Sequence, residues 1–166
     1  PRQSINLKNF QYFREPGNMR QKIILRVVSK ILIPYILLFA FYVQWHGDFG
    51  PGGGFQAGVI FAAGIILYGI IFGIGTVRNV LPASATRLFL TIGVLLYSGV
   101  GIAGIILGGN FLDYNVLAEV PVHGQHIGIL LVEFGVGITV ASAMITIFCA
   151  FAGRQPEKYD EEYFGD

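Results

Sequence analysis

Residues 125–153 read QHIGILLVEFGVGITVASAMITIFCAFAG, and this stretch decides the fold class of the chain. It is longer than the roughly 20 apolar residues that an α-helix needs to cross a bilayer, and Glu133 is its only formally charged residue. A carboxylate inside a membrane helix costs about 2.5–3.5 kcal/mol on insertion scales. Such a group normally faces a partner helix or a wet cavity, so Glu133 is the first candidate for a functional residue.

Three more apolar runs, each of about 20 residues, precede this stretch. Hydrophobic residues make up 54% of the 166 residues and charged residues only 13%, about half the usual share in a soluble domain. We therefore predict an all-α membrane protein with four transmembrane helices, at about Leu25–Trp45, Phe55–Thr76, Arg87–Gly108 and His126–Ala152. The predicted organisation is a basic segment at 1–24, a transmembrane domain at 25–152 and an acidic tail at 153–166.

The polar ends and the single cysteine narrow the class further. The first 22 residues are polar and basic with no early apolar region, so we expect no secretory signal peptide there. Cys149 lies inside the fourth predicted helix. A lone cysteine excludes an internal disulfide and cannot make a metal site by itself.

The basic residues predict how the chain lies in the membrane. All 11 Lys and Arg residues fall before or early in the first helix, around the second connection, or in the tail. The first and third connections, 46–54 and 109–124, contain none. Because cytoplasmic segments carry the excess of Lys and Arg, we expect both termini to be cytoplasmic and these two connections to face outside.

Small residues recur at four-residue spacing in the predicted helices, which allows helix backbones to approach closely in lipid. The sets are Gly54, Gly58 and Ala62; Gly69 and Gly73; Gly104 and Gly108; Gly137 and Ala141. Small faces on several helices indicate neighbours outside this chain as well as inside it. We expect other membrane subunits and lipid to cover them.

Glu133 shares a helix face with Ile129, Gly137 and Ala141, by the i, i+4, i+8 spacing. The acid is therefore expected on the packing face of its helix. His126 lies seven residues earlier, about 10 Å along the axis and on roughly the same side. Three interpretations remain open: a carboxyl hydrogen-bonded to a neighbouring helix, a relay for protons or cations, or a salt bridge to a basic residue of another subunit.

The segment HGDFGPGGGFQAG, residues 46–58, predicts a tight glycine turn that we call the elbow, formed by Pro51, Gly52, Gly53 and Gly54. Pro51 is expected to start the next helix, and the glycine N–H groups could form an anion-binding nest. No Lys-Ser/Thr follows, so this is not a Walker loop. Gln56 is expected to hydrogen-bond to another helix, or else to handle ions. His46 is an interfacial histidine or a proton-entry group.

Other functions find little support in the sequence. His123 and His126 could share a helix face, but no further ligand lies close in sequence, and we expect no metal site. The basic and aromatic N-terminal segment is better explained by anionic lipid than by nucleic acid. We find no nucleophile–base pair, paired acids or cofactor motif, so no cofactor and no enzymatic activity are expected.

The elbow motif His46–Gly58, together with Gly124–Gly128 (GQHIG) and Leu131–Gly135 (LVEFG), resembles the B subunit of multisubunit Na⁺/H⁺ antiporters of the Mrp or Mnh type. The similarity covers about residues 20–152. It implies a small subunit of a large hetero-oligomer in a prokaryotic cell membrane, which exchanges cytoplasmic Na⁺ for external H⁺. Related domains occur in membrane-bound hydrogenases and similar ion-pumping complexes.

The sequence thus predicts a four-span subunit of a cation/proton antiporter. Glu133 is the leading candidate for an ion pathway that moves H⁺ or Na⁺, and His126, Gln56 and His46 are secondary candidates. The alternatives are a scaffold subunit that no transported ion touches, and the related subunit of a membrane-bound hydrogenase.

Overall fold

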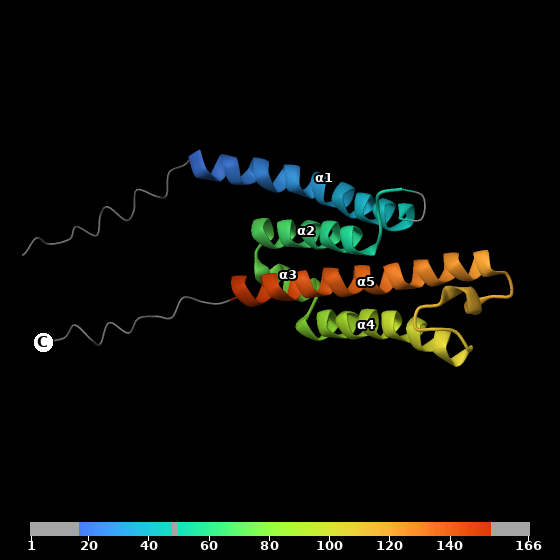
Figure 1. Cartoon of the computed structure of the whole chain (residues 1–166). Coiled ribbons are helices and arrows are strands. Elements are labelled where there is room, and N and C mark those ends of the chain that lie inside the picture. Colours follow the sequence, from blue (N-terminus) through green and yellow to red (C-terminus); the bar gives the residue numbers. More distant parts are fainter. Residues whose placement is uncertain (1–16, 48–49, 154–166) are drawn as a thin grey trace, which may run out of the picture.

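The computed structural model describes residues 17–47 and 50–153. Four long helices, each apolar enough to span a membrane, make up most of this part of the chain (Figure 1). They are α1 (Gly17–His46), α2 (Gly54–Phe72), α4 (Ala83–Ile106) and α5 (Pro121–Ala152). A short helix, α3 (Ile74–Val80), and a 3₁₀ turn, η2 (Tyr114–Leu117), lie in the connections. The all-helical prediction with four spans is confirmed.

The four long helices stand side by side in a row, in the order α1, α2, α5, α4 (Figure 1). Each helix packs along its neighbour in the row, whereas α1 reaches α5 only over a short stretch. The start of α1 and the end of α5 lie at the same end of the row (Figure 1). The elbow and the 107–120 connection lie at the opposite end, which we call the elbow end.

A layer one helix thick cannot bury the apolar side chains that its helices carry. Tyr35 and Leu38 of α1 are each 66% exposed, and so is Ile70 of α2. In a bilayer such side chains are covered by lipid or by other membrane proteins. The row therefore presents broad faces to its surroundings, as the small-residue pattern suggested.

The second connection corrects the predicted end of the second helix. α2 ends at Phe72 rather than near Thr76, because Gly73 adopts φ 92° and ψ 150° and interrupts the helix. The chain resumes at once as α3. Arg78 of α3 donates through Nη2 to the carbonyl oxygen of Cys149 at 3.4 Å. The guanidinium of Arg78 provides a hydrogen-bond donor for a carbonyl near the C-terminal end of α5. Its positive charge also interacts favourably with the negative end of the α5 helix dipole.

Close backbone approach holds the centre of the row together. A Cβ built at Gly58 would lie 2.6 Å from the carbonyl oxygen of Gly137, so α2 and α5 meet through glycines at this level. On the other side of α5, a Cβ at Gly93 of α4 would overlap the hydroxyl of Thr139. Gly73 and Gly108 lie just beyond the ends of α2 and α4 and have positive φ, and an added Cβ at either meets nothing within 4 Å in the described part of the chain.

The 107–120 connection docks onto the first turns of α5 through Tyr114. Its ring covers Gly128, and its carbonyl oxygen lies against Gly124, so both glycines are needed for this contact. Gln125 donates from Nε2 to the side-chain oxygen of Asn115 at 2.9 Å. Burial, and then the neighbouring Tyr97, raise the pKa of the Tyr114 phenol, which stays neutral throughout the physiological pH range.

Candidate functional site

Glu133 lies where α5 passes the elbow, and its side chain is half-buried. A Cβ built at Gly47 would lie 2.6 Å from both of its carboxyl oxygens, and one built at Gly53 would lie 3.1 Å from Oε1. The main-chain carbonyl of Glu133 lies directly against Gly54. The carboxyl group therefore occupies a notch that exists because Gly47 and Gly53 lack side chains.

Two backbone hydrogen bonds shape this notch. The N–H of Gly53 donates to the carbonyl of Val43, and the N–H of Gly50 donates to the carbonyl of His46, both at 3.2 Å. Gly53 has φ 111° and ψ 173°, a conformation that is essentially restricted to glycine. The elbow therefore depends on glycine at residue 53.

The elbow departs from the sequence interpretation in two details. Pro51 does not start the helix, because α2 begins three residues later, at Gly54, with Gly53 as its N-cap. Pro51 is instead an exposed residue of the turn itself. The N–H of Gly53 is directed to Val43 within the elbow, so it is not free for the anion-binding nest that the glycine run suggested.

The packing face predicted for Glu133 is confirmed. Gly137 and Ala141, one and two turns after the acid, are buried like Gly54 and Gly58 on the facing side of α2. Next to Glu133, Phe134 meets the indole of Trp45 edge to face, with ring centroids 5.3 Å apart. This contact fixes the end of α1 against α5 beside the carboxyl group.

The secondary candidates differ in their surroundings. His46 stacks on Tyr42, with ring centroids 5.2 Å apart, and its Nε2 lies next to Gly50. Gln56 and His126 are both exposed on the outside of the row. Among the described residues no three His, Cys, Asp or Glu side chains come together as a metal site would require.

The sequence matches a family model over residues 24–146, which include the elbow and Glu133. The chain belongs to the MnhB family. This family is described as a domain related to the MnhB subunit of Na⁺/H⁺ antiporters. The resemblance drawn from the elbow and from the LVEFG segment is thereby confirmed.

Named relatives of this MnhB-family chain include proteins of Staphylococcus aureus strains Newman, JH1 and Mu3, each called "putative antiporter subunit mnhB2". Each is 34% identical over 134 residues, which cover 79% of this chain and 94% of the relative. The match therefore spans nearly the whole length of these relatives. The sequence predicts a transporter subunit rather than an enzyme, and the family match confirms this prediction.

Gln44 is a buried polar residue of this MnhB-family structure that the sequence pattern does not single out. Gln44, two residues before the end of α1, is only 7% exposed, and its Oε1 lies against Gly137. Gln56, the glutamine that the sequence favoured, is exposed instead. The available signal was the i, i+4 relation of Gln44 to Ala40, a small residue that marks the packing face of α1.

The arrangement suits binding and release of a small cation or a proton rather than covalent chemistry. The Glu133 carboxyl group sits in a glycine notch at the elbow end of the row, and the next residue, Phe134, packs on Trp45. Hard cations prefer oxygen ligands of this kind.

Proposed function

We propose that this chain acts as the B subunit of a multisubunit Na⁺/H⁺ antiporter and that Glu133 takes part in moving H⁺ or Na⁺. The observation that carries the proposal is the placement of the Glu133 carboxyl in the notch of Gly47 and Gly53. An acid in an apolar membrane segment is costly and is commonly part of an ion pathway. Here the acid has a defined position at the elbow end of the row.

The notch gives the carboxyl group a short route to one membrane surface. Glu133 lies level with the start of α2, next to the residues that leave the end of α1. An ion or a proton that arrives from the elbow side reaches the carboxyl without crossing the hydrocarbon core. Onward transfer would then use other subunits of the complex, for which the exposed faces of the row provide contact area.

His126 and Gln56 enter this proposal as groups at a subunit boundary. Both are exposed on the chain itself, one on α5 and one on α2. Intramembrane polar groups on such faces normally pair with groups on neighbouring helices. His46 lies on the elbow side, where a histidine can exchange protons with the solvent.

The test is Na⁺-driven proton movement in everted vesicles that carry the whole complex. Glu133→Gln keeps the shape of the side chain and removes its charge. We expect an assembled complex whose antiport falls about tenfold, the effect of roughly 1.4 kcal/mol on a barrier. Glu133→Asp, which keeps the carboxyl group, should retain more activity. Glu119→Gln, an exposed acid of the 107–120 connection, is the matched control.

The alternative outcomes separate the two roles. Unchanged antiport at every pH in an assembled Glu133→Gln complex would make the chain a scaffold that no transported ion touches. Loss of the complex on native gels would assign Glu133 to packing instead. Gene neighbours that encode a hydrogenase would favour the related hydrogenase subunit over the antiporter subunit.

A further inference from the structure

The side-chain amide of Gln44 lies one helical turn further from the elbow than the Glu133 carboxyl. Gln44 Oε1 lies 2.7 Å from a Cβ built at Gly137, which follows Glu133 by four residues on α5. The Glu133 carboxyl oxygens lie 2.6 Å from a Cβ built at Gly47, which follows Gln44 by three residues. Because α1 and α5 run in opposite directions (Figure 1), these two contacts stack one turn apart, about 5 Å along the helix axes.

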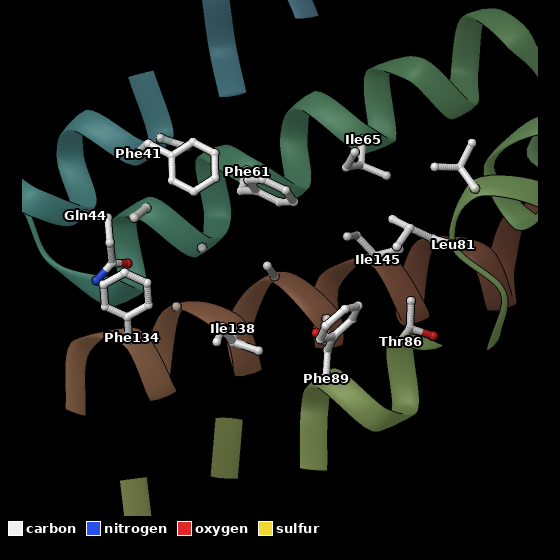
Figure 2. Close-up of a pocket in the computed structure, with 17 residues that line it drawn as sticks. Phe41, Gln44, Phe61, Ile65, Leu81, Thr86, Phe89, Phe134, Ile138 and Ile145 are labelled. Carbon is white, nitrogen blue, oxygen red and sulfur yellow. The ribbon is translucent and has the colours of Figure 1, made fainter. Parts of the chain in front are cut away.

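The amide nitrogen of Gln44 is directed toward the elbow. Figure 2 shows Nε2 turned toward the elbow end and away from Ile138 and the apolar pocket, one end of which Gln44 lines. Gln44 is only 7% exposed, and Nε2 is buried without a hydrogen-bond partner among the described residues. A buried amide N–H without an acceptor costs free energy, and burial keeps solvent from supplying one. An acceptor on a neighbouring side chain would remove this cost.

The Glu133 carboxyl is the acceptor that this position favours. Backbone carbonyl groups beside the amide belong to α2 and α5, where they accept hydrogen bonds within their own helices. The hydroxyl of Thr139 faces α4 and donates to the carbonyl of Gly135. The carboxyl end of Glu133 is flexible and lies about one turn from Gln44. A change of side-chain rotamer can therefore carry the carboxyl from the notch toward Nε2.

We propose that Gln44 is a positioning residue for Glu133, and that Nε2 donates to the carboxylate when it turns inward from the glycine notch. This inference rests on the proposed role of Glu133 in moving H⁺ or Na⁺. In the notch the carboxyl lies on the elbow side, where an ion arrives. In the inward position it lies closer to the middle of the row, and the hydrogen bond from Gln44 stabilises its charged form. Gln44 thereby gives the carboxyl a second position along the route.

A spectroscopic test reports on the hydrogen bond itself. Infrared difference spectra of the whole complex with and without Na⁺ should contain a carboxylate band that disappears in Glu133→Gln and so belongs to Glu133. We expect this band to shift in Gln44→Met, which keeps the length of the side chain and removes the donor. Thr139→Val, which removes a hydroxyl that faces α4, should leave the band in place.

Two outcomes of this test contradict different claims. An unshifted Glu133 band in Gln44→Met would overturn the pairing and leave the proposed ion role of Glu133 intact. Absence of any Glu133 band from the wild-type difference spectrum would contradict that ion role, and the inference would fall with it.

A double-mutant cycle measures whether the two side chains act together in transport. Gln44→Met should lower antiport about tenfold in an assembled complex, the lower end expected for a hydrogen bond to a charged group. In a Glu133→Gln background the same change should have little further effect. Thr139→Val should leave antiport unchanged in both backgrounds. Equal fractional losses from Gln44→Met in the two backgrounds would refute the pairing.

An exchange of the two groups gives a measurement that does not depend on transport. Gln44→Glu places a second carboxyl group about one turn from Glu133, and we expect less assembled complex on native gels because like charges repel. Adding Glu133→Gln leaves one carboxyl and one amide, and should recover much of that loss. Equal yields of Gln44→Glu with and without Glu133→Gln would show that the two side chains do not approach each other, and would overturn the proposal.

Discussion

The main-chain carbonyl of Glu133 lies so close to Gly54 that no side chain fits at residue 54. An added Cβ would overlap that oxygen and lie 2.9 Å from the Cα of Glu133. These are backbone atoms of two packed helices, so neither can move aside cheaply. The same contact that joins α2 to α5 therefore also sets the height of the Glu133 carboxyl relative to the elbow.

Gly54→Ala should separate α2 from α5 at this level. We expect a destabilisation of about 3 kcal/mol, the upper end for overpacking, and poor recovery of the assembled complex. The measurement is the thermal stability of the detergent-solubilised complex together with its yield. Gly99→Ala is the control, because Gly99 is helical and exposed and an added Cβ meets nothing within 4 Å. Equal stability of the two variants would contradict the packing argument.

Gly47→Ala should act on the carboxyl group instead of the backbone. Its Cβ would lie 2.6 Å from both carboxyl oxygens of Glu133, and the flexible end of that side chain can move away. We expect the complex to assemble and antiport to fall. In a Glu133→Gln background, Gly47→Ala should have little further effect, because the two changes act on one group. Additive losses in this double-mutant cycle would mean that Gly47 acts elsewhere.

Comparing valine variants of Gly53 and Gly73 distinguishes the effect of backbone strain from the effect of contact with Glu133. Both residues have a positive φ and an extended ψ, a region where other residues cost about 1–3 kcal/mol. A Cβ at Gly53 also approaches Glu133, whereas one at Gly73 meets nothing within 4 Å. Both valine variants should lower stability, and Gly53→Val should impair assembly more. A normally assembled and active Gly53→Val complex would show that the elbow tolerates a side chain.

The orientation of the row in the membrane can be measured by placing a cysteine at either of two exposed asparagines. Asn115 lies in the connection at the elbow end, and Asn79 lies in α3 at the opposite end; both are exposed. In a Cys149→Ala background, a membrane-impermeant maleimide added to intact cells should label Asn115→Cys and spare Asn79→Cys. This follows from the positive-inside rule, since Arg26, Arg78 and Arg87 all lie toward the end opposite the elbow. The reverse pattern of labelling would place the elbow in the cytoplasm.

The sequence determined the class of the fold and singled out Glu133 as a candidate. Four apolar runs of about 20 residues predict four membrane-spanning helices, because in a membrane the backbone must satisfy its hydrogen bonds within each helix. An ionisable residue in an apolar run and a run of glycines both cost free energy in a folded membrane protein. Glu133 and the elbow therefore stand out in the sequence. Spacing within one helix also placed Glu133 on the packing face with Gly137.

Only the tertiary structure decided which helices are neighbours and what surrounds each polar group. The order α1, α2, α5, α4 arises from contacts between residues far apart in sequence, such as Gly58 with Gly137 and Gly93 with Thr139. Helical periodicity ranks faces within one helix but does not say which other helix covers them. For that reason the sequence pattern does not single out the buried Gln44, and it does not show that α2 ends at Gly73.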